Sequence, residues 1–478
     1  MSSERGLLVG GRWKPGSAVT EVIDPAKGEA MGNTAVASPD DVAEAAQAAR
    51  GAQPEWAALA PAERRDLLTR AADLIEERSG EIASILTSEQ GKPVADALKE
   101  VRFGADVLRY YGEEATRLHA ELRPSLDHAD LRSLVEYRPV GVVGAIVPWN
   151  YPVDLWCWKV GAALAAGNAV VAKPPLETPL AVGRVAQCLL DAGLPDGLLS
   201  DLPGEATVGK ALVENQGVGL ISATASVDAG RAIVAASVRH LPRLLLELGG
   251  HSPFVVLDDA DVEAAAVAAT RRSFSNTGQI CIAVNRVVVS QKVADDFADA
   301  VVEATDRIVV GDPSDPAVTC GPVTIPDVRK RTLRHLANAT ARGGRTLRGP
   351  TDSFDSAPGY FLSPIVVADV PSDADVMREE TYGPLMPIHR VADDDAALAV
   401  ANSLPYGLAA YVYGGDLGRA WRFADRLEFG MVGVNVNDTT ELLAPFGGWK
   451  LSGFGSELGP EGLRNYTRVR HIRMRLPW

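Results

Sequence analysis

The sequence predicts an α/β fold in which a parallel sheet is covered by helices. From Gly141 onward, helical segments alternate with short apolar runs rich in β-branched residues, which read GVVGAIVPWN, NAVVAKP, GVGLISAT and PFVVLDD. Apolar runs of this length are typical of strands buried on both faces, and their alternation with helices is typical of a parallel sheet. The chain has 478 residues, of which 46% are hydrophobic, and this length suggests about three domain-sized units.

The segment before these strands is predicted to be mostly helical. After a short start that is expected to form a hairpin, Ser38 can cap a helix whose first turn holds Pro39 and two aspartates, residues that suit the positive end of the helix dipole. An alanine-rich helical pattern then continues to about Leu118. We expect breaks in it near Pro54, Pro61 and Gly91.

A second series of helices and strands follows. Residues 262–274 and 292–308 are predicted to be helices, with a strand at residues 286–290 between them. Four later runs predict further strands: SPIVVADV, PLMPIHRV, AAYVYG and GMVGVNV. The run YTRVRHIRMRL alternates basic and apolar side chains as an exposed edge strand does. Because an open edge usually needs a partner strand, this pattern indicates an oligomer.

Charge and composition exclude several classes of partner. The net charge is -15 at pH 7, so we expect no nucleic-acid partner, because phosphate binding needs a basic surface. The four cysteines form no CxxC pair, which argues against a disulfide framework and against a metal site. No apolar run reaches about 18 residues, and the N-terminus lacks the apolar stretch of a signal peptide. We expect a reducing, cytoplasmic location and no membrane partner.

The stretch NTGQICIAVNR, residues 276–286, contains the first candidate for chemistry, Cys281. Gly278 is expected to end the preceding helix, so that Cys281 lies in irregular chain with free backbone N–H groups. Such groups lower the pKa of a thiol and can stabilise an oxyanion. The alternative is a packed core thiol, the common state of a free cysteine. Only this second interpretation suits Cys188, which lies in the helical run VAQCLLDAG.

Two other residues can assist a nucleophilic thiol. Glu247 is a single carboxylate among apolar residues and glycines in LLLELGGHSP, and burial there should raise its pKa to a value useful for a general base. Asn150 follows the predicted strand in AIVPWN, where its amide can donate to an oxyanion. The alternatives are a carboxylate satisfied by local N–H groups and an asparagine in a tight turn.

A phosphate-bearing cofactor has candidate positions at the ends of two predicted strands. Lys173 ends AVVAK at a carboxyl edge, where open α/β sheets bind ligands. Ser226 begins the helix SVDAGRAIVAAS, and a helix N-terminus can hold a phosphate, although an ordinary N-cap explains this serine equally well. Glu380, in MREETYGPLMP, is either part of this site or a surface carboxylate.

Six stretches together resemble the aldehyde dehydrogenase superfamily over nearly the whole chain. In the order and at the separations of that family they are PWNYP (148–152), AAGNAVVAKP (165–174), LELGG (246–250), GQICIAVNR (278–286), EETYGP (379–384) and PFGGWKLSGFGSELG (445–459). One such match can arise by chance, whereas six in register are specific.

The resemblance implies a role for each matching residue. Cys281 is then the nucleophile, Glu247 the general base, Asn150 the side-chain half of an oxyanion hole, and Lys159 a further catalytic-site lysine. The implied cofactor-binding residues are Ile146, Val147, Pro148, Trp149, Lys173, Glu177, Gly209, Ser226, Leu248, Gly249, Glu380 and Tyr382. The implied substrate-pocket residues are Tyr151, Leu155, Trp158, Ile280, Ile282 and Phe446.

The family fold implies three parts for this chain. Residues 1–117 and 140–251 are expected to form a Rossmann-type dinucleotide-binding domain, and residues 252–451 an α/β catalytic domain. A small β oligomerisation element, with the C-terminal segment, is expected at residues 118–139 and 452–478, giving a homodimer or homotetramer.

Several positions depart from the family pattern. Ala223-Thr224-Ala225-Ser226 stands where Phe-Thr-Gly-Ser is usual at the phosphate turn, and His251 stands where lysine is common. Leu176 replaces a glutamate that in the family favours NAD, while the carboxylate is shifted to Glu177. A leucine neither binds a ribose 2′-hydroxyl nor repels a 2′-phosphate. We therefore expect NAD or NADP, with NAD favoured because no extra cation is evident for NADP.

The predicted reaction is oxidation of an aldehyde to a carboxylate, with a medium-sized aliphatic or aromatic aldehyde as substrate. Asp154, Asp438 and Glu441 lie near the pocket residues in sequence and are expected to be solvated carboxylates at its rim; the alternative is that they favour a cationic or hydroxylated substrate. Two other functions stay open: an acylating dehydrogenase that passes its thioester to coenzyme A, and a non-catalytic protein on the same scaffold. Glu247 argues against the first, and Cys281, Glu247 and Asn150 together argue against the second.

Overall fold

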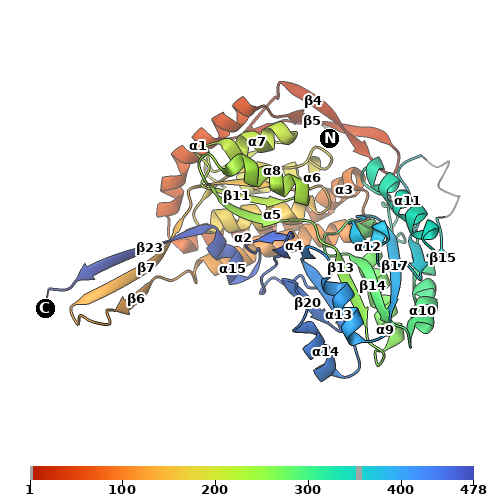
Figure 1. Ribbon diagram of the computed structural model, residues 1–478. Coiled ribbons are helices and arrows are strands. Elements are labelled where there is room, and N and C mark those ends of the chain that lie inside the picture. The colour runs from red at the N-terminus through yellow and green to blue at the C-terminus, as the bar shows by residue number, and fades with distance from the viewer. Residues whose placement is uncertain (1–3, 351–357, 478) are drawn as a thin grey trace.

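The computed structural model describes residues 4–350 and 358–477 (Figure 1). Its first large sheet has eight strands, in the spatial order β22 (Gly453–Phe454), β12 (Arg243–Glu247), β11 (Leu220–Thr224), β8 (Val142–Ile146), β9 (Ala169–Lys173), β10 (Leu199–Asp201), β2 (Leu7–Val9) and β3 (Arg12–Lys14). The strands from β12 to β10 are parallel to one another, and antiparallel strands flank them on both sides. The predicted α/β class is confirmed.

The connections of this sheet place its helices. The chain runs in one direction from β8 to β10 through α5 (Pro152–Ala165) and α6 (Leu180–Asp191), and in the other from β11 to β12 through α8 (Val227–Ser237). Because parallel crossovers are right-handed, α5 and α6 cover one face and α8 covers the other. The direction reverses between β8 and β11, and the crevice at the carboxyl ends of such strands is where open α/β sheets bind ligands.

The N-terminal helices confirm most of the predicted pattern. They are α1 (Pro39–Ala58), α2 (Pro61–Glu77), α3 (Ser79–Gln90) and α4 (Val94–Ala115); a shorter helix, α7 (Ala206–Glu214), precedes β11. The side chain of Ser38 caps α1 as expected, but the break near Pro54 is wrong, because α1 continues through this proline. The last turn carries Trp56, which is buried and donates from Nε1 to the Leu164 carbonyl at 2.9 Å. This packing outweighs the hydrogen bond that a proline cannot make.

The second large sheet has seven strands. They are, in spatial order, β15 (Arg345–Arg348), β16 (Ile365–Ala368), β17 (Leu385–Val391), β14 (Val284–Ser290), β13 (Ser252–Val256), β19 (Ala409–Tyr413) and β20 (Met431–Val434). The helices of this part are α9 (Val262–Phe274), α10 (Ala294–Asp306), α11 (Pro326–Ala341), α12 (Asp375–Arg378), α13 (Asp394–Asn402) and α14 (Leu417–Ala424), whereas α15 (Gly459–Asn465) packs on α4 and α5. The helices and strands predicted here are confirmed, with α9 followed by a 3₁₀ turn, Ser275–Gly278.

The two large sheets meet end to end. The chain leaves the first sheet at the carboxyl end of β12 and, after residues 248–251, enters the second at the amino end of β13. The carboxyl edge of the first sheet therefore faces the amino edge of the second. The predicted site residues of both parts lie in this region.

A small antiparallel sheet projects from the body as an arm. It consists of β23 (Thr467–Arg475), β7 (Leu131–Pro139) and β6 (Glu121–Pro124), in that order, and Figure 1 shows the C-terminal end at its tip. β23 pairs on one side only, so the predicted edge strand is confirmed. The remaining strands are β1 (Glu4–Arg5), β5 (Glu29–Val36) and β4 (Ala18–Asp24) in one sheet, and β18 (Tyr406–Gly407) with β21 (Trp449–Lys450) in another. Within the described residues, no helix is both long and apolar enough to cross a membrane.

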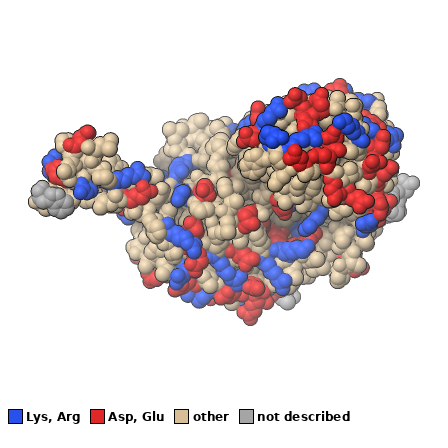
Figure 2. Space-filling model, turned by 90° about the horizontal axis from the view of Figure 1, so that it is seen from below, with Lys and Arg blue, Asp and Glu red and all other residues tan. Residues whose placement is uncertain are grey.

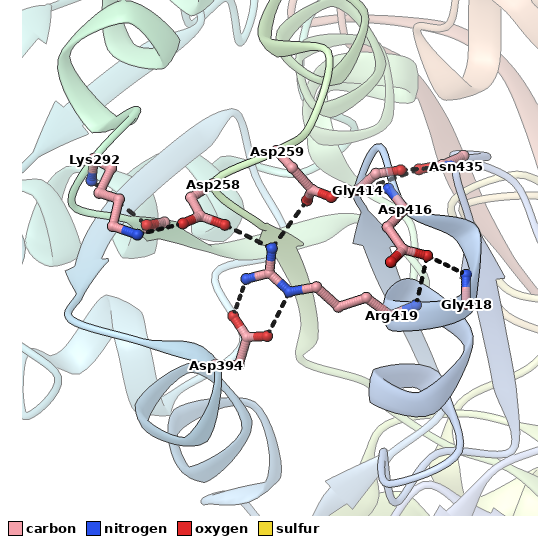
Figure 3. Close-up of polar contacts among 10 residues, drawn as sticks. Asp258, Asp259, Lys292, Asp394, Gly414, Asp416, Gly418, Arg419 and Asn435 are labelled. Atoms are coloured by element: carbon pink, nitrogen blue, oxygen red, sulfur yellow. Dashed lines mark hydrogen bonds and ion pairs between the residues drawn. The ribbon is translucent and has the colours of Figure 1, made fainter.

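An ion-pair network closes the carboxyl edge of the second sheet (Figure 3). Arg419, on α14, binds both carboxylate oxygens of Asp394, at 2.8 and 2.6 Å, and reaches Asp258 at 2.6 Å and Asp259 at 3.2 Å. Lys292 pairs with the other oxygen of Asp258 at 2.6 Å. Seen from below, the lobe that carries α14 is crowded with side chains of both signs (Figure 2). The network ties the end of β13 to α13 and α14.

We expect Arg419→Met to lower the free energy of unfolding by about 1 kcal/mol at pH 7, because three aspartates then face one another without their shared cation. The hydrogen bonds from Lys292 and Arg419 lower the pKa of Asp258 to about 2 in the folded chain from an ordinary value of 3.8. A lowered folded-state pKa stabilises the protein above the unfolded value and loses its effect as pH falls. The difference from wild type, measured by urea denaturation, should therefore shrink between pH 3.8 and about 2. Arg422→Met on the same helix is the control; an equal loss in both variants would contradict the assignment.

Candidate active site

Cys281 lies in irregular chain between α9 and β14, at the amino edge of the second sheet. The chain reaches it through Asn276, Thr277 and Gly278, whose φ angles are 49°, 56° and 75°. Left-handed backbone is strained for a residue with a side chain, so surrounding contacts must hold the first two. Gly278 also packs closely against the next loop, because a Cβ there would lie 2.4 Å from the Gly383 carbonyl oxygen. The position of the thiol is thus set by a strained turn.

The structure corrects the predicted pKa of the Cys281 thiol. The backbone N–H groups of Cys281 and Ile282 favour the thiolate, as expected for irregular chain. Burial outweighs them, and the carboxyl groups of Glu380 and Glu247 act in the same direction as burial, so the pKa of the thiol is raised to about 12. The prediction of a lowered pKa is therefore wrong, and the thiol is neutral at pH 7.

Glu247 ends β12 and is buried close to Cys281, with 2% of its surface exposed. Neither of its carboxyl oxygens has a hydrogen-bond partner among the described residues. Burial raises the pKa of Glu247 well above its usual range; Glu457 raises it further, whereas Lys159 opposes the shift. The predicted rise is confirmed, and the alternative of a carboxylate satisfied by local N–H groups is wrong. A carboxyl group in this state can accept and release a proton near the thiol.

Lys159, on α5, forms a buried ion pair behind Glu247. Its Nζ lies 2.7 Å from Oε1 of Glu457, and both side chains are at most 1% exposed. Nζ also donates to Thr224 Oγ1 at 2.8 Å. Glu457 was not singled out from the sequence, although it lies within the matching stretch PFGGWKLSGFGSELG. The pair places a permanent dipole next to the carboxyl group of Glu247.

Asn150 is held in place from two sides. Its Nδ2 donates to the Gln279 carbonyl at 3.0 Å, and its own carbonyl accepts from Lys92 Nζ at 2.8 Å and from Asn276 Nδ2 at 3.1 Å. The Nδ2 group has a second hydrogen, and Asn150 lines the same cavity as Cys281. The asparagine therefore does more than form a turn: it connects the end of β8 to the Cys281 loop.

Lys92 and Glu100 support Asn150 from behind. They form a buried ion pair, and Lys92 Nζ lies 3.8 Å from the centre of the Tyr151 ring. Glu100 Oε1 accepts hydrogen bonds from the backbone N–H groups of Val153 at 3.0 Å and Asp154 at 3.3 Å, and so caps α5. The sequence carried no signal for either residue, because KPVADALKE has the composition of an exposed helix.

A cavity of about 760 Å³ leads to the thiol. Its wall includes Cys281, Asn150 and every predicted substrate-pocket residue, namely Tyr151, Leu155, Trp158, Ile280, Ile282 and Phe446. The rings of Trp158 and Phe446 meet edge to face at 5.1 Å. The predicted pocket residues are thus mostly aromatic and aliphatic, while the same wall also includes Arg271, Arg272 and Arg307.

The three carboxylates expected at the rim differ in their surroundings. Asp154 lines the cavity but is only 8% exposed and accepts a 2.6 Å hydrogen bond from Trp158 Nε1, so its interpretation as a solvated rim residue is wrong. Asp438 also lines the cavity and pairs with Arg272 at 2.5 Å. Glu441 does not line it among the described residues.

The predicted cofactor residues follow the carboxyl edge of the first sheet. Ile146 ends β8, and Val147, Pro148 and Trp149 follow it. Lys173 ends β9, and Glu177 follows it. Gly209 lies on α7, Ser226 follows β11, and Leu248 and Gly249 follow β12. Lys173 Nζ has no hydrogen bond or ion pair within the described chain, and burial lowers its pKa while Glu177 raises it. Ser226 Oγ accepts from the Ala229 N–H at 3.3 Å, so this serine is an N-cap and the N-terminus of α8 faces the edge.

Glu380 and Tyr382 reach the same place from the second sheet. Glu380 Oε1 accepts from the Gly250 N–H at 3.3 Å, and burial raises the pKa of Glu380 to about 7. The Tyr382 ring lies edge to face with Trp149 at 5.5 Å. His251 is fully buried, and its Nε2 lies 3.0 Å from the Glu379 carbonyl oxygen, which fixes this loop to the LELGG segment. Glu380 is therefore not a surface carboxylate.

These residues suit a dinucleotide. A helix N-terminus and an unpaired lysine can hold phosphate groups, while a buried carboxyl group with an oxygen against Gly250 and a pair of aromatic rings can hold a ribose and a planar ring. The edge lies at the switch of strand direction, where such ligands bind.

Comparison with known proteins agrees with this geometry. Residues 13–472 match the family model described as the aldehyde dehydrogenase family. The chain is 36% identical over 469 residues to the succinate-semialdehyde dehydrogenase [NADP(+)] of Escherichia coli K12, covering 97% of this chain and 96% of that protein. It is 38% identical over 458 residues to the betaine aldehyde dehydrogenase of Sinorhizobium fredii, covering 95% and 93%.

Solved structures give the same result. The crystal structure of an NADP-dependent enzyme of E. coli superposes with a TM-score of 0.97 at 35% identity, covering 99% of this chain and 98% of that one. The family supports NAD(P) as the cofactor, but the preference for NAD has no support, because the names of two of these relatives specify NADP. The predicted fold and the predicted class of enzyme, an oxidoreductase, are confirmed: the chain belongs to the aldehyde dehydrogenase family.

Proposed function

We propose that this protein oxidises an aldehyde to a carboxylate with NAD(P) through a thioester on Cys281. The observation that carries this proposal is the buried carboxyl group of Glu247, whose oxygens have no hydrogen-bond partner in the described chain and whose charge acts on the Cys281 thiol at the wall of the cavity. A structural carboxyl group would be satisfied by hydrogen bonds, because an unpaired buried polar group is costly. The family supplies the class of reaction.

The residues divide the reaction into two steps. In the first, the Cys281 thiol loses its proton to solvent and its sulfur attacks the aldehyde carbon; the oxyanion that forms accepts hydrogen bonds from Asn150 Nδ2 and from the backbone N–H of Cys281, and its return to a carbonyl expels the hydrogen of that carbon as hydride and leaves the thioester. When bound, the oxidised nicotinamide ring supplies a hydride acceptor and a positive charge. In the second step, Glu247 takes a proton from water, the hydroxide adds to the thioester carbon, and the sulfur leaves as the carboxylate product is released.

The cofactor is proposed to lie along the carboxyl edge of the first sheet, with Lys173, Glu177, Ser226 and Glu380 as its polar contacts. We propose NADP as the better substrate of the two dinucleotides. Leu176 presents no carboxylate to a 2′-phosphate, and Glu177 is exposed to solvent. The relatives whose names specify NADP support the same choice.

The proposed substrate is an aldehyde with an aliphatic or aromatic body, because apolar side chains line the cavity next to the thiol. The relatives named above act on aldehydes of opposite charge, so their names do not decide this point.

The protein is proposed to be a homodimer or homotetramer, since the arm exposes Leu122, Leu126 and Val469 and a three-stranded sheet with so little core is unstable in water. Four free cysteines support a reducing, cytoplasmic location.

The first prediction concerns the two central residues. Cys281→Ala should lower aldehyde-dependent formation of NAD(P)H by about four orders of magnitude or more, with unchanged cofactor binding as evidence of folding. Glu247→Gln should release one equivalent of reduced cofactor in a burst and then turn over about 10²- to 10⁴-fold more slowly than wild type, because thioester hydrolysis loses its general base. Absorbance of the reduced nicotinamide would be followed with both dinucleotides and with anionic, neutral and cationic aldehydes. A wild-type steady rate for Glu247→Gln would refute its role.

A second prediction follows from the neutral thiol. Because the pKa of Cys281 is about 12, the thiolate fraction in the cofactor-free protein should rise about tenfold per pH unit. The rate of Cys281 alkylation by iodoacetamide, measured by mass spectrometry of the peptide, should therefore increase continuously from pH 7 to pH 9. Cys281→Ala shows how much the other cysteines contribute to total labelling. A plateau below pH 8 would mean that the thiol is ionised more easily than its burial implies.

A third prediction concerns Glu380. Its pKa of about 7 arises from burial, which disfavours the carboxylate. The carboxylate is the stronger acceptor for ribose hydroxyl groups, so cofactor affinity should increase as pH rises through 7. Calorimetric titration of NADP between pH 6 and pH 8 should show this increase in wild type and a weaker, pH-independent affinity in Glu380→Gln. An identical pH dependence in the variant would assign the titration to another group.

A further inference from the structure

A second cavity, of about 590 Å³, opens at the opposite edge of the first sheet. It lies at the amino ends of β8, β11 and β12, whereas the cofactor candidates lie at the carboxyl ends. Its polar wall consists of Arg50, Gln53, Gln216, His240, Arg243 and Arg468. Among the residues that the structure describes, no aspartate or glutamate lines it.

The three arginines converge from distant parts of the chain. Arg50 comes from α1, Arg243 begins β12, and Arg468 lies at the base of the arm in β23. The guanidinium of Arg468 packs on the loop before β11, where a Cβ on Gly219 would lie 2.9 Å from its Nη2. The Arg50 side chain packs on the same loop, where a Cβ on Gly217 would lie 2.9 Å from its Cδ. The loop thus brings two of the arginines to one wall.

None of these arginines has a carboxylate partner in the described part of the chain. The Arg243 guanidinium donates to the Thr467 carbonyl, and burial together with the charge of Arg468 lowers the pKa of Arg243. His240 adds a buried Nε2 atom that has no hydrogen-bond partner within the described residues. Like charges held together without a counter-charge destabilise the folded chain.

This arrangement is unusual for the composition of the protein. The sequence has 62 acidic and 47 basic residues, so carboxylates are in excess. Elsewhere, most arginines at the surface pair with them, as Arg12 does with Asp196 and Arg109 does with Asp73 and Glu76. Arg50, Arg243 and Arg468 are all exposed to solvent, so this positively charged cavity without acidic side chains can attract an anion from solution.

We propose that this cavity binds a phosphate group, either as inorganic phosphate or at the end of a small phosphate ester. Planar guanidinium groups bind phosphate oxygens in pairs, and several of them can share one dianion. The volume exceeds that of a single phosphate and is in the range of sites for small ligands. The site is separate from the cofactor edge and needs no change in the proposed reaction.

Calorimetric titration of inorganic phosphate into the full-length protein tests the proposal. NADP at saturating concentration keeps phosphate out of the cofactor site, and sodium chloride holds the ionic strength constant. Wild type should bind one phosphate per chain. Arg50→Gln and Arg468→Gln should each raise the dissociation constant about tenfold, the effect of losing one hydrogen bond to a charged group. Arg422→Gln, on exposed α14, is the matched control and should bind as wild type does.

Two results would overturn the proposal. The first is equal affinity in all four proteins, which would place the phosphate elsewhere. The second is no saturable binding to wild type together with a changed molecular mass of Arg468→Gln in light scattering, which would mean that a second copy of the chain supplies the counter-charge. Arg50 lies on α1 and not on the arm. Weaker phosphate binding by Arg50→Gln would therefore indicate loss of the phosphate site and not damage to the arm. Unchanged aldehyde oxidation by Arg50→Gln would show that this variant is folded.

Discussion

The left-handed turn at residues 276–278 is the constraint on which the site depends. A turn of this kind is unstable by itself, so it persists only because neighbouring groups hold it. Gln90 Nε2 donates to Asn276 Oδ1 at 3.0 Å, Thr277 Oγ1 donates to the Gly321 carbonyl at 3.0 Å, and Asn276 Nδ2 donates to the Asn150 carbonyl. The thiol, the oxyanion-hole candidate and the N-terminal helices are thereby fixed to one another, and loosening any one of them displaces the rest.

Burial is the second organising feature. It raises the pKa of both the Cys281 thiol and the Glu247 carboxyl group, because removal from water disfavours their charged forms. Burying the Lys159–Glu457 ion pair adds little stability, because desolvation offsets most of the attraction. Its value lies in the fixed field that it places beside Glu247. The site thus combines two reactive groups whose pKa values are raised with a permanent dipole behind one of them.

The features of this molecule that could be predicted are those that depend on residues adjacent in sequence. Apolar runs predicted the strands of a parallel sheet but did not reveal that the run PFVVLDD belongs to a second sheet, as β13. Six short motifs located Cys281, Glu247, Asn150 and the residues around them. Features that depend on distant contacts could not be predicted. Lys92 donates a hydrogen bond to Asn150, which lies 58 residues later in the chain. Trp56, whose packing lets α1 continue past Pro54, donates to Leu164, which lies 108 residues later. The thiol pKa was predicted in the wrong direction because it depends on burial, which no neighbouring residue in sequence reveals.

The arm has a consequence for the order of events during synthesis. Its central strand, β7, finds its partner β23 only after more than 300 further residues, as the 334-residue separation of Glu136 and Arg470 shows. While the chain is still growing, β7 can pair with β6 alone, and a two-stranded ribbon is at best marginally stable. The sheet is therefore complete only when both large sheets have already been made. Neighbouring unfinished chains on one messenger RNA consequently carry no finished arm.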